Sequence, residues 1–233
     1  MSIRLHSLSS ALIAVTAVMV LLGTLYFSSL RHGYSQISNT ISELGEAGAS
    51  YAHPVAFGFF LPVGLMVWLA LWLMHREIPG KNVSLVLFAL SCLGTGYVVS
   101  AFFPCDVGAP IFGSWRTLVH NAAGLVDYGG TAIGFLLVCR CFARQKATTQ
   151  AAVFGVCGAL VLVCMVPLCV RPAFPVRGAA QRVAELIQFT GVFFVCLLLP
   201  RTQTPNKSAP GKGGIGSLFH TGRIWPALPE QRR

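Results

Sequence analysis

The chain has 233 residues, of which 55% are hydrophobic and only 10% are charged, and its formal net charge is +10. Soluble domains carry about 25% charged residues, so this composition excludes an ordinary soluble globular protein. The basic residues are dispersed and accompany no nucleic-acid-binding motif, so the positive charge does not indicate a nucleic-acid partner.

Six apolar runs follow one another along the chain. Each has roughly 20 residues, the length that a helix needs to cross a hydrocarbon core of about 30 Å. Together they leave no room for a separate soluble domain, so we predict an all-α, polytopic membrane bundle of six transmembrane helices in residues 1–199. The runs are Ala11–Leu30, Pro54–Met74, Val83–Phe103, Asn121–Cys139, Ala151–Val170 and Val183–Leu199.

The first run is predicted to be a retained span. It is longer than the apolar region of a secretion signal, and "YFSSLRHG" offers no small-x-small cleavage site. If the N-terminus is cytoplasmic, twelve of the seventeen lysines and arginines lie on the cytoplasmic side, as the positive-inside tendency requires. We therefore predict a multi-pass protein of the cell inner membrane with both termini in the cytoplasm. Residues 200–233, rich in Pro, Gly, Lys and Ser, are predicted to form a disordered basic cytoplasmic tail.

The segment "RHGYSQISNTISELGEAGASYAHP" (31–54) is a polar stretch between the first two runs. Within it, "TISE" has the spacing of a capping box, in which the Thr40 hydroxyl and the Glu43 carboxylate satisfy free amides at the start of a short helix. Gly45 is expected to end that helix. An ordered loop needs a surface to pack against, and the two other outer loops (104–120 and 171–182) are the candidates.

The fourth run contains Asp127, one heptad after His120, so both side chains lie on one helix face with Gly124 as an open notch between them. An aspartate at mid-membrane costs about 2.5–3.5 kcal/mol on insertion scales, so a lipid-facing position is excluded. Asp127 is therefore either a functional group or a neutral carboxyl bonded to a neighbouring helix. Its candidate partners in the second case are Thr95, Tyr97 and Ser100.

A weak internal repeat links the fourth and sixth runs. Shifting the chain by 61 residues aligns Asp127 with Gln188 and His120 with Gln181, which predicts three repeated helical hairpins. Glu185 and Gln188 extend a polar stripe in the sixth run, where Glu185 is expected to reach the membrane interface.

We predict that the outer loops and outer half-helices form one polar pocket for a lipid or a small amphiphilic or anionic molecule, which the protein binds or moves. The candidate residues are Ser38, Asn39, Glu43, His53, Asp106, Arg116, His120 and Asp127. Membrane lipids are the expected partners, and no cofactor is predicted.

Several alternatives stay open. One is a membrane-embedded hydrolase that uses these groups for acid–base chemistry, or for zinc chemistry through His53, His120, Asp106 and Asp127. Another is a scaffold without a ligand. Asp106 and Arg116 are also compatible with a plain ion pair, and Cys105 with Cys169 is compatible with a disulfide at the outer boundary.

The motifs "YSQISNTISELGEAGASYA" and "FPCDVGAP", with a histidine near the start of the next span, resemble the prokaryotic six-span membrane family called domain of unknown function 998 (DUF998). The resemblance covers about residues 10–200. It implies a helical integral membrane protein with both motifs on one side, and it implies no activity. The "ISELG" and "FP" elements are also distantly similar to lipid-associated six-span proteins of the Frag1/DRAM/Sfk1 type, which favours a lipid.

Overall fold

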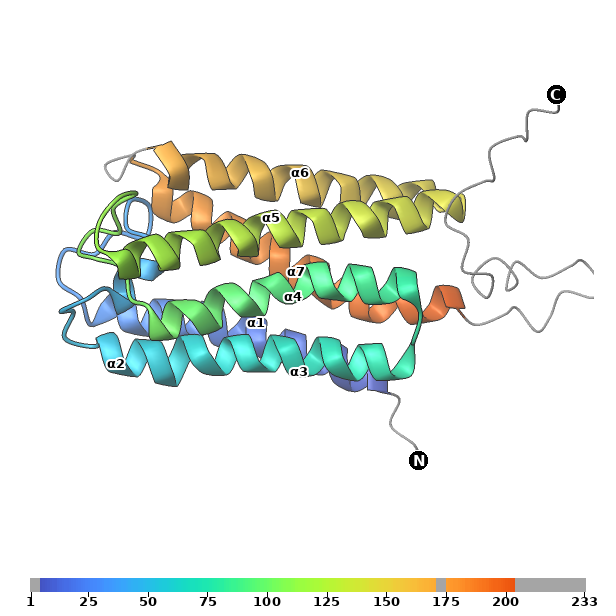
Figure 1. The fold of residues 1–233 in the computed structure, drawn as a ribbon, viewed down its shortest axis with the longest axis horizontal. Helices are drawn as coiled ribbons and strands as arrows, with labels where there is room; N and C mark the ends of the chain where they lie inside the picture. The colour runs from blue at the N-terminus through green and yellow to red at the C-terminus, as the bar shows by residue number, and fades with distance from the viewer. Residues whose placement is uncertain (1–4, 171–174, 204–233) are drawn as a thin grey trace, which may run out of the picture.

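The structure, a computed structural model, describes residues 5–170 and 175–203. Throughout these residues the regular structure is helical and contains no strand, and six helices are long and apolar enough to cross a membrane (Figure 1). The predicted six-span membrane bundle is thereby confirmed. In chain order the elements are α1 (Leu5–Ser29), η1 (Ser42–Gly45), α2 (Ala52–Val55), η2 (Ala56–Phe60), α3 (Leu61–Glu77), α4 (Lys81–Phe102), α5 (Trp115–Arg144), α6 (Thr148–Val170) and α7 (Arg177–Gln203).

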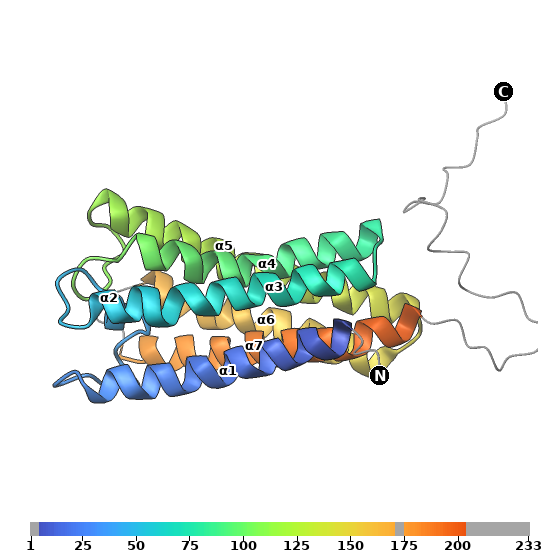
Figure 2. The same ribbon diagram turned by 90° about the horizontal axis from the view of Figure 1, so that it is seen from below.

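The six long helices run side by side and alternate in direction (Figures 1 and 2). Each packs against the next one in the chain, and α7 returns to pack against α1, so the bundle is a closed ring in chain order. One end, which we call the short-loop end, holds the connectors 78–80 and 145–147 together with the start of α1. The opposite end, which we call the loop end, holds the longer segments 30–51 and 103–114.

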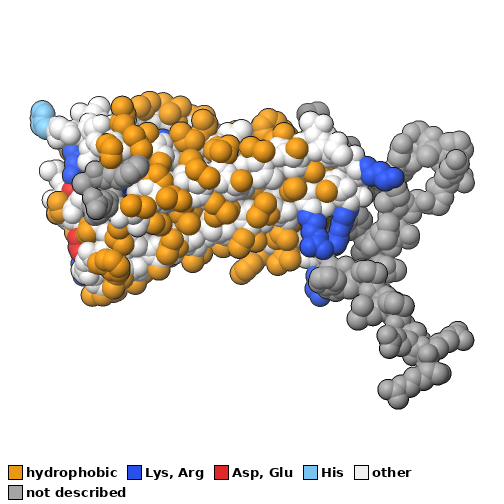
Figure 3. Space-filling model, turned by 90° about the horizontal axis from the view of Figure 1, so that it is seen from above, with side chains coloured by type: hydrophobic (Ala, Val, Ile, Leu, Met, Phe, Trp, Pro, Cys, Tyr) orange, Lys and Arg blue, Asp and Glu red, His pale blue; other side chains and the backbone are white. Residues whose placement is uncertain are grey.

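The outer surface of the bundle is apolar along most of its length, as contact with lipid tails requires (Figure 3). Outward-facing side chains such as Phe88, which is 73% exposed, form this surface. Lysine and arginine side chains gather at the short-loop end of the same face. The chain is thus a multi-pass membrane protein.

Three helices differ in extent from the apolar runs. α1 begins at Leu5 and α5 extends from Trp115 to Arg144, well beyond the predicted run at both ends. The start of α5 is set by Ser114, whose hydroxyl accepts a hydrogen bond from the Thr117 amide at 3.4 Å. α7 continues to Gln203, and the rest of the predicted cytoplasmic tail lies outside the described residues. Hydropathy marks the apolar part of a helix, whereas capping decides where the helix begins.

Candidate functional site

The capping box predicted in the first loop is present. The Thr40 amide donates to Glu43 Oε1 at 2.9 Å, and the Glu43 amide donates to Thr40 Oγ1 at 3.4 Å. These two hydrogen bonds lie at the start of the short helix η1, a 3₁₀-helix that ends at Gly45 as expected. Glu43 is only 3% exposed, so the box is a buried element of the loop end.

Hydrogen bonds join the first loop (residues 30–51) to the start of α7. The Ile41 amide donates to Gln181 Oε1 at 2.7 Å, and the Ala179 amide donates to the Ile37 carbonyl at 2.9 Å. Arg182 adds a hydrogen bond from Nη1 to the Asn39 carbonyl at 2.9 Å. Segments about 140 positions apart in the chain are therefore joined by three hydrogen bonds to backbone groups of the first loop, which require a defined loop conformation.

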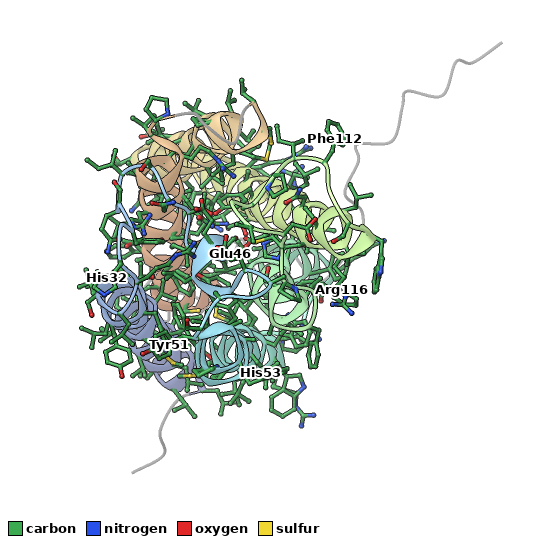
Figure 4. The ribbon with its side chains drawn as sticks, turned by 90° about the vertical axis from the view of Figure 1, so that its left-hand side faces the viewer. His32, Glu46, Tyr51, His53, Phe112 and Arg116 are labelled. Atoms are coloured by element: carbon green, nitrogen blue, oxygen red, sulfur yellow. The ribbon has the colours of Figure 1, made fainter. Side chains whose placement is uncertain are left out.

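Hydrogen bonds also join the first loop to the second loop (residues 103–114). The Ala47 amide donates to the Cys105 carbonyl at 2.8 Å, and the Gly108 amide donates to Glu46 Oε2 at 2.7 Å. The other Glu46 oxygen pairs with Arg31 at the end of α1. Glu46 is 4% exposed and lies near the middle of the loop end (Figure 4).

Arg177, the first residue of α7, connects α7 to the second loop. Its Nη2 donates to the Ala109 carbonyl at 2.8 Å and its Nη1 to the Gly108 carbonyl at 3.3 Å, while Glu43 Oε1 lies 4.0 Å away. The first loop, the second loop and the start of α7 are thus hydrogen-bonded into one layer over the loop end of the bundle, which we call the cap.

A cavity of about 260 Å³ lies beneath this cap, and we call it the loop-end cavity. α5 and α7 both pack against α6 and approach each other closely at few positions, and the cavity lies among α4, α5, α6 and α7. Its polar lining comes from residues 40–42, α4, α5, α7 and Cys169 of α6, and its apolar lining includes residues of α6 and the second loop. The polar and ionisable lining residues are Thr40, Ser42, Tyr97, Ser100, His120, Asn121, Asp127, Tyr128, Cys169, Arg177, Gln181 and Glu185.

Two buried carboxyl groups line the cavity. Glu185 accepts hydrogen bonds from the Tyr97 hydroxyl at 2.8 Å and the Tyr128 hydroxyl at 3.1 Å. Its 5% exposure corrects the expectation that it reaches the membrane interface: two hydroxyl donors on α4 and α5 stabilise it inside the bundle. Asp127, 4% exposed, accepts from Gln188 Nε2 at 2.8 Å. The partner of Asp127 is therefore an amide of α7, and not Thr95, Tyr97 or Ser100.

His120 is, with Asp127, one of two residues of the predicted set that line the cavity. Its Nδ1 lies 2.9 Å from the Phe103 carbonyl oxygen and its Nε2 lies 3.0 Å from Ser42 Oγ. The histidine thereby joins α5 to Phe103, the residue that follows α4, and to η1. Gly124 also lines the cavity and has no atom within 4 Å of the position of an added Cβ, as expected for a notch on this face.

The eight predicted site residues are only partly brought together. His120 and Asp127 line the cavity, and Asn39 and Glu43 belong to the segment that covers it, with Asn39 Nδ2 donating to Glu43 Oε2 at 2.6 Å. Ser38 is exposed and lies outside the lining.

The other three predicted residues belong to the loop end but lie outside the lining of the cavity. His53 is exposed and stacks on Phe57 with ring centroids 5.7 Å apart, and Arg116 is exposed over the Trp115 ring (Figure 4). Asp106 accepts from the Ser114 amide at 2.6 Å and the Ser114 hydroxyl at 2.8 Å, next to the start of α5. Among the described residues no ion pair joins it to Arg116 within 4.0 Å, so its role is in helix capping.

The zinc alternative does not fit these positions. His53 and Asp106 lie apart from the cavity, and no three His, Cys, Asp or Glu side chains of residues 5–170 and 175–203 are placed to share one ion. The disulfide alternative is not realised either, because Cys105 and Cys169 are both free thiols. Cys105 is fully buried, with its Sγ 3.6 Å from the Ser42 carbonyl oxygen.

Titration of the groups in the loops follows their surroundings. The hydrogen bonds from Ser114 lower the pKa of Asp106, because they favour the charged carboxylate. Burial raises the pKa of the Cys105 thiol to about 12, and the nearby Glu46 and Glu43 act in the same direction. Burial also raises the pKa of Tyr34 to about 12, although the Arg182 guanidinium opposes this shift. At neutral pH the two loops therefore hold Asp106 as an anion and Cys105 and Tyr34 as neutral groups.

The sequence predicted a polar stripe of Glu185 and Gln188 but assigned no residue of α7 to the pocket. Arg177, Gln181, Glu185 and Gln188 recur at helical spacing and form one polar face. This spacing was a usable signal, because four polar residues on one face of an apolar helix seldom face lipid. Tyr97 and Tyr128 carried no such signal, since tyrosines in spans also occur at the membrane interface.

A family model described as protein of unknown function (DUF998) matches residues 13–198. The chain belongs to this family. The match includes η1, the second loop and every helix that lines the loop-end cavity, so the cavity lies inside the family's domain. No curated protein and no solved structure matches the chain.

Proposed function

We propose that this membrane protein binds a membrane amphiphile, a lipid or a smaller amphiphilic molecule, whose polar group occupies the loop-end cavity. The observation that carries the proposal is the combination of buried ionisable groups and apolar residues in one cavity of about 260 Å³. Pockets for whole drug-sized ligands are about 300–1,000 Å³, so this one has the size of a head group. The apolar part of the ligand then lies outside it, along the bundle surface.

The apolar wall indicates where that tail lies. Met165 and Leu168 of α6 and Leu125 of α5 line the cavity, and Leu125 is 51% exposed on the outer surface. α6 is the least buried of the six spans. An alkyl chain that leaves the cavity between α5 and α6 would remain among apolar side chains and lipid tails.

The lining favours a polar group that offers hydrogen-bond donors, such as hydroxyls or an amine. Asp127 and Glu185 supply carboxyl oxygens, whereas the cavity's guanidinium, that of Arg177, already donates to the carbonyls of Gly108 and Ala109. Since Arg116 is exposed outside the cavity, an anionic head group has weaker support than the sequence suggested.

We also propose that the loop end faces away from the cytoplasm in the cell inner membrane, with both termini in the cytoplasm. Support comes from the twelve lysines and arginines that this orientation assigns to the cytoplasmic side, against five on the other. In this orientation the cavity takes its ligand from the outer leaflet.

Native mass spectrometry of the full chain, released from its own membranes in a mild detergent, tests the binding proposal. We expect a retained lipid adduct that weakens about fivefold or more in Glu185→Gln, because leaving a buried hydrogen-bonding group of the ligand unpaired costs about 1–3 kcal/mol. Glu77→Gln is the matched control, since Glu77 pairs with His6 at the opposite end of the bundle. A wild-type protein without an adduct, or equal retention by both variants, would refute the proposal.

A further inference from the structure

Ser42 and His120 form a close pair inside the loop-end cavity. Ser42 is the first residue of η1 and His120 lies in the second turn of α5, 78 positions further along the chain, yet Ser42 Oγ is 3.0 Å from His120 Nε2. Both side chains line the cavity. The hydroxyl and the imidazole are therefore available to a molecule bound there.

The second hydrogen bond of His120 decides which ring nitrogen carries the proton. Nδ1 lies 2.9 Å from the Phe103 carbonyl oxygen, which only accepts hydrogen bonds, so a neutral imidazole places its proton on Nδ1. Nε2 then presents its lone pair to Ser42, and the Ser42 hydroxyl donates to it. This is the arrangement of a nucleophile and a general base, with the Phe103 carbonyl as the group that orients the base.

The surroundings hold the pair in position while leaving the hydroxyl accessible. From Thr40 to Glu46, Ser42 alone is not fully buried, whereas His120 is only 6% exposed. The backbone around Ser42 is fixed by the bond from the Ile41 amide to Gln181 and by the Cys105 thiol, 3.6 Å from the Ser42 carbonyl oxygen.

We propose that Ser42 and His120 are the nucleophile and the general base of an acyl-transfer reaction on a carboxylic ester of an amphiphile. The proposal rests on the binding function above and specifies its substrate class. A donor that could stabilise the developing oxyanion also lines the cavity, namely the side-chain amide of Gln181, whose oxygen accepts from the Ile41 amide next to Ser42.

The chemistry needs only the ester and water. Ser42 Oγ attacks the ester carbonyl carbon as its proton passes to His120 Nε2, and the carbonyl electron pair moves onto oxygen. Collapse of this intermediate breaks the bond to the alcohol, which takes the proton from Nε2 and leaves an acyl group on Ser42. Water then attacks the acyl carbon, gives a proton to Nε2, and releases the carboxylic acid as Ser42 recovers its proton.

A fluorophosphonate probe tests the assignment on the purified full chain, followed by peptide mass spectrometry. We expect covalent labelling at Ser42, none at that position in Ser42→Ala, and a labelling rate at least about 100-fold lower in His120→Gln, since general bases contribute about 10²–10⁴-fold. Ser38→Ala is the matched control, because Ser38 lies in the same loop, is more exposed and has no histidine hydrogen-bonded to it. It should label at Ser42 at the wild-type rate.

Monodisperse elution and an unchanged thermal midpoint establish that each variant is folded. If Ser42→Ala does not fold, Ser42→Cys replaces it: the introduced thiol should react with iodoacetamide faster than Cys169, because His120 accepts its proton. Absence of label at Ser42 in the folded wild type, or equal labelling of Ser38 and Ser42, overturns the proposal.

Hydrolysis of 4-nitrophenyl butyrate and native mass spectrometry of Ser42→Ala separate the two proposals. Ester hydrolysis that is lost in Ser42→Ala supports the Ser42–His120 pair. A lipid adduct in a protein without hydrolysis and without label refutes the pair and leaves the binding function standing. Absence of adduct, label and hydrolysis together refutes both.

Discussion

The side-chain amide of Gln188 on α7 donates to Asp127 Oδ1 on α5 across 2.8 Å, and both residues are buried. This bond joins two helices that share few other contacts, next to the loop-end cavity. It also joins the two positions that a shift of 61 residues aligns, although the repeat itself stays a prediction. The remaining acceptor of the amide, Gln188 Oε1, has no hydrogen-bond partner among the described residues.

Replacing Gln188 by methionine should destabilise the protein by about 1–3 kcal/mol, because it leaves the buried Asp127 carboxyl without its donor. Chemical unfolding in detergent micelles measures the free energy of unfolding. Leu186→Met serves as control, since Leu186 is 69% exposed on the outside of the same helix, and should change it by less than about 0.5 kcal/mol. Equal effects of the two substitutions would show that the bond contributes nothing.

The contact between α3 and α4 should not tolerate a methyl group at Gly64. A Cβ added there would lie 2.6 Å from the Gly94 carbonyl oxygen, a backbone atom that cannot move aside without shifting a helix. We expect Gly64→Ala to lower the free energy of unfolding by about 1–3 kcal/mol.

Gly129→Ala in α5 is the matched control for this contact. A Cβ at Gly129 meets no atom within 4 Å, so the substitution should be neutral or stabilise the helix by up to about 1 kcal/mol. Thermal unfolding of both variants in the same detergent compares them. A Gly64→Ala protein as stable as the wild type would mean that the two helices are not packed this closely.

The capping role of Asp106 predicts an acid-dependent loss of stability. Its pKa in the folded protein is below the ordinary value because Ser114 donates two hydrogen bonds to the carboxylate. A lowered folded pKa contributes stability above the unfolded pKa of about 4, and this contribution disappears as the pH falls through the folded value.

Thermal midpoints measured between about pH 6 and pH 3 should therefore fall less steeply in Asp106→Asn than in the wild type. Asparagine retains an oxygen that accepts from Ser114 but does not titrate. If the thermal midpoint of Asp106→Asn falls as steeply with decreasing pH as that of the wild type, other carboxyl groups account for the whole loss of stability.

Cysteine labelling tests the proposed orientation. In variants that keep a single cysteine, a membrane-impermeant maleimide added to intact cells should modify Cys169, which is exposed at the loop end of α6. Cys141, near the short-loop end of α5, should react only after the cells are permeabilised. The opposite pattern would invert the topology. Cys105 should stay unmodified in the folded protein on either protocol, since it is fully buried and its pKa is about 12.

Local features of this protein were predictable from the sequence. The number of spans follows from runs of roughly 20 apolar residues, because membrane thickness sets that length independently of how the helices pack. The reciprocal bonds of Thr40 and Glu43 follow from a three-residue spacing that any helix start can use. The shared face of His120 and Asp127 follows from the helical period. Helix ends were placed less accurately, as the start of α5 at Trp115 illustrates, because capping by Ser114 extends the helix into polar sequence.

Which other residues join His120 and Asp127 in the cavity was decided by the tertiary structure. Ser38 and Ser42 lie in the same predicted loop, but only Ser42 meets His120, because the bonds of that loop to α7 and to the second loop fix its conformation. Glu185 is held inside by Tyr97 and Tyr128, two hydroxyls from two other helices that share no sequence spacing with it. The sequence by itself determined that six helices cross a membrane and that the fourth and the sixth carry a polar face. Which of those faces meet depends on the order and rotation of helices in the ring, and this is a property of packing between distant segments that no local pattern encodes.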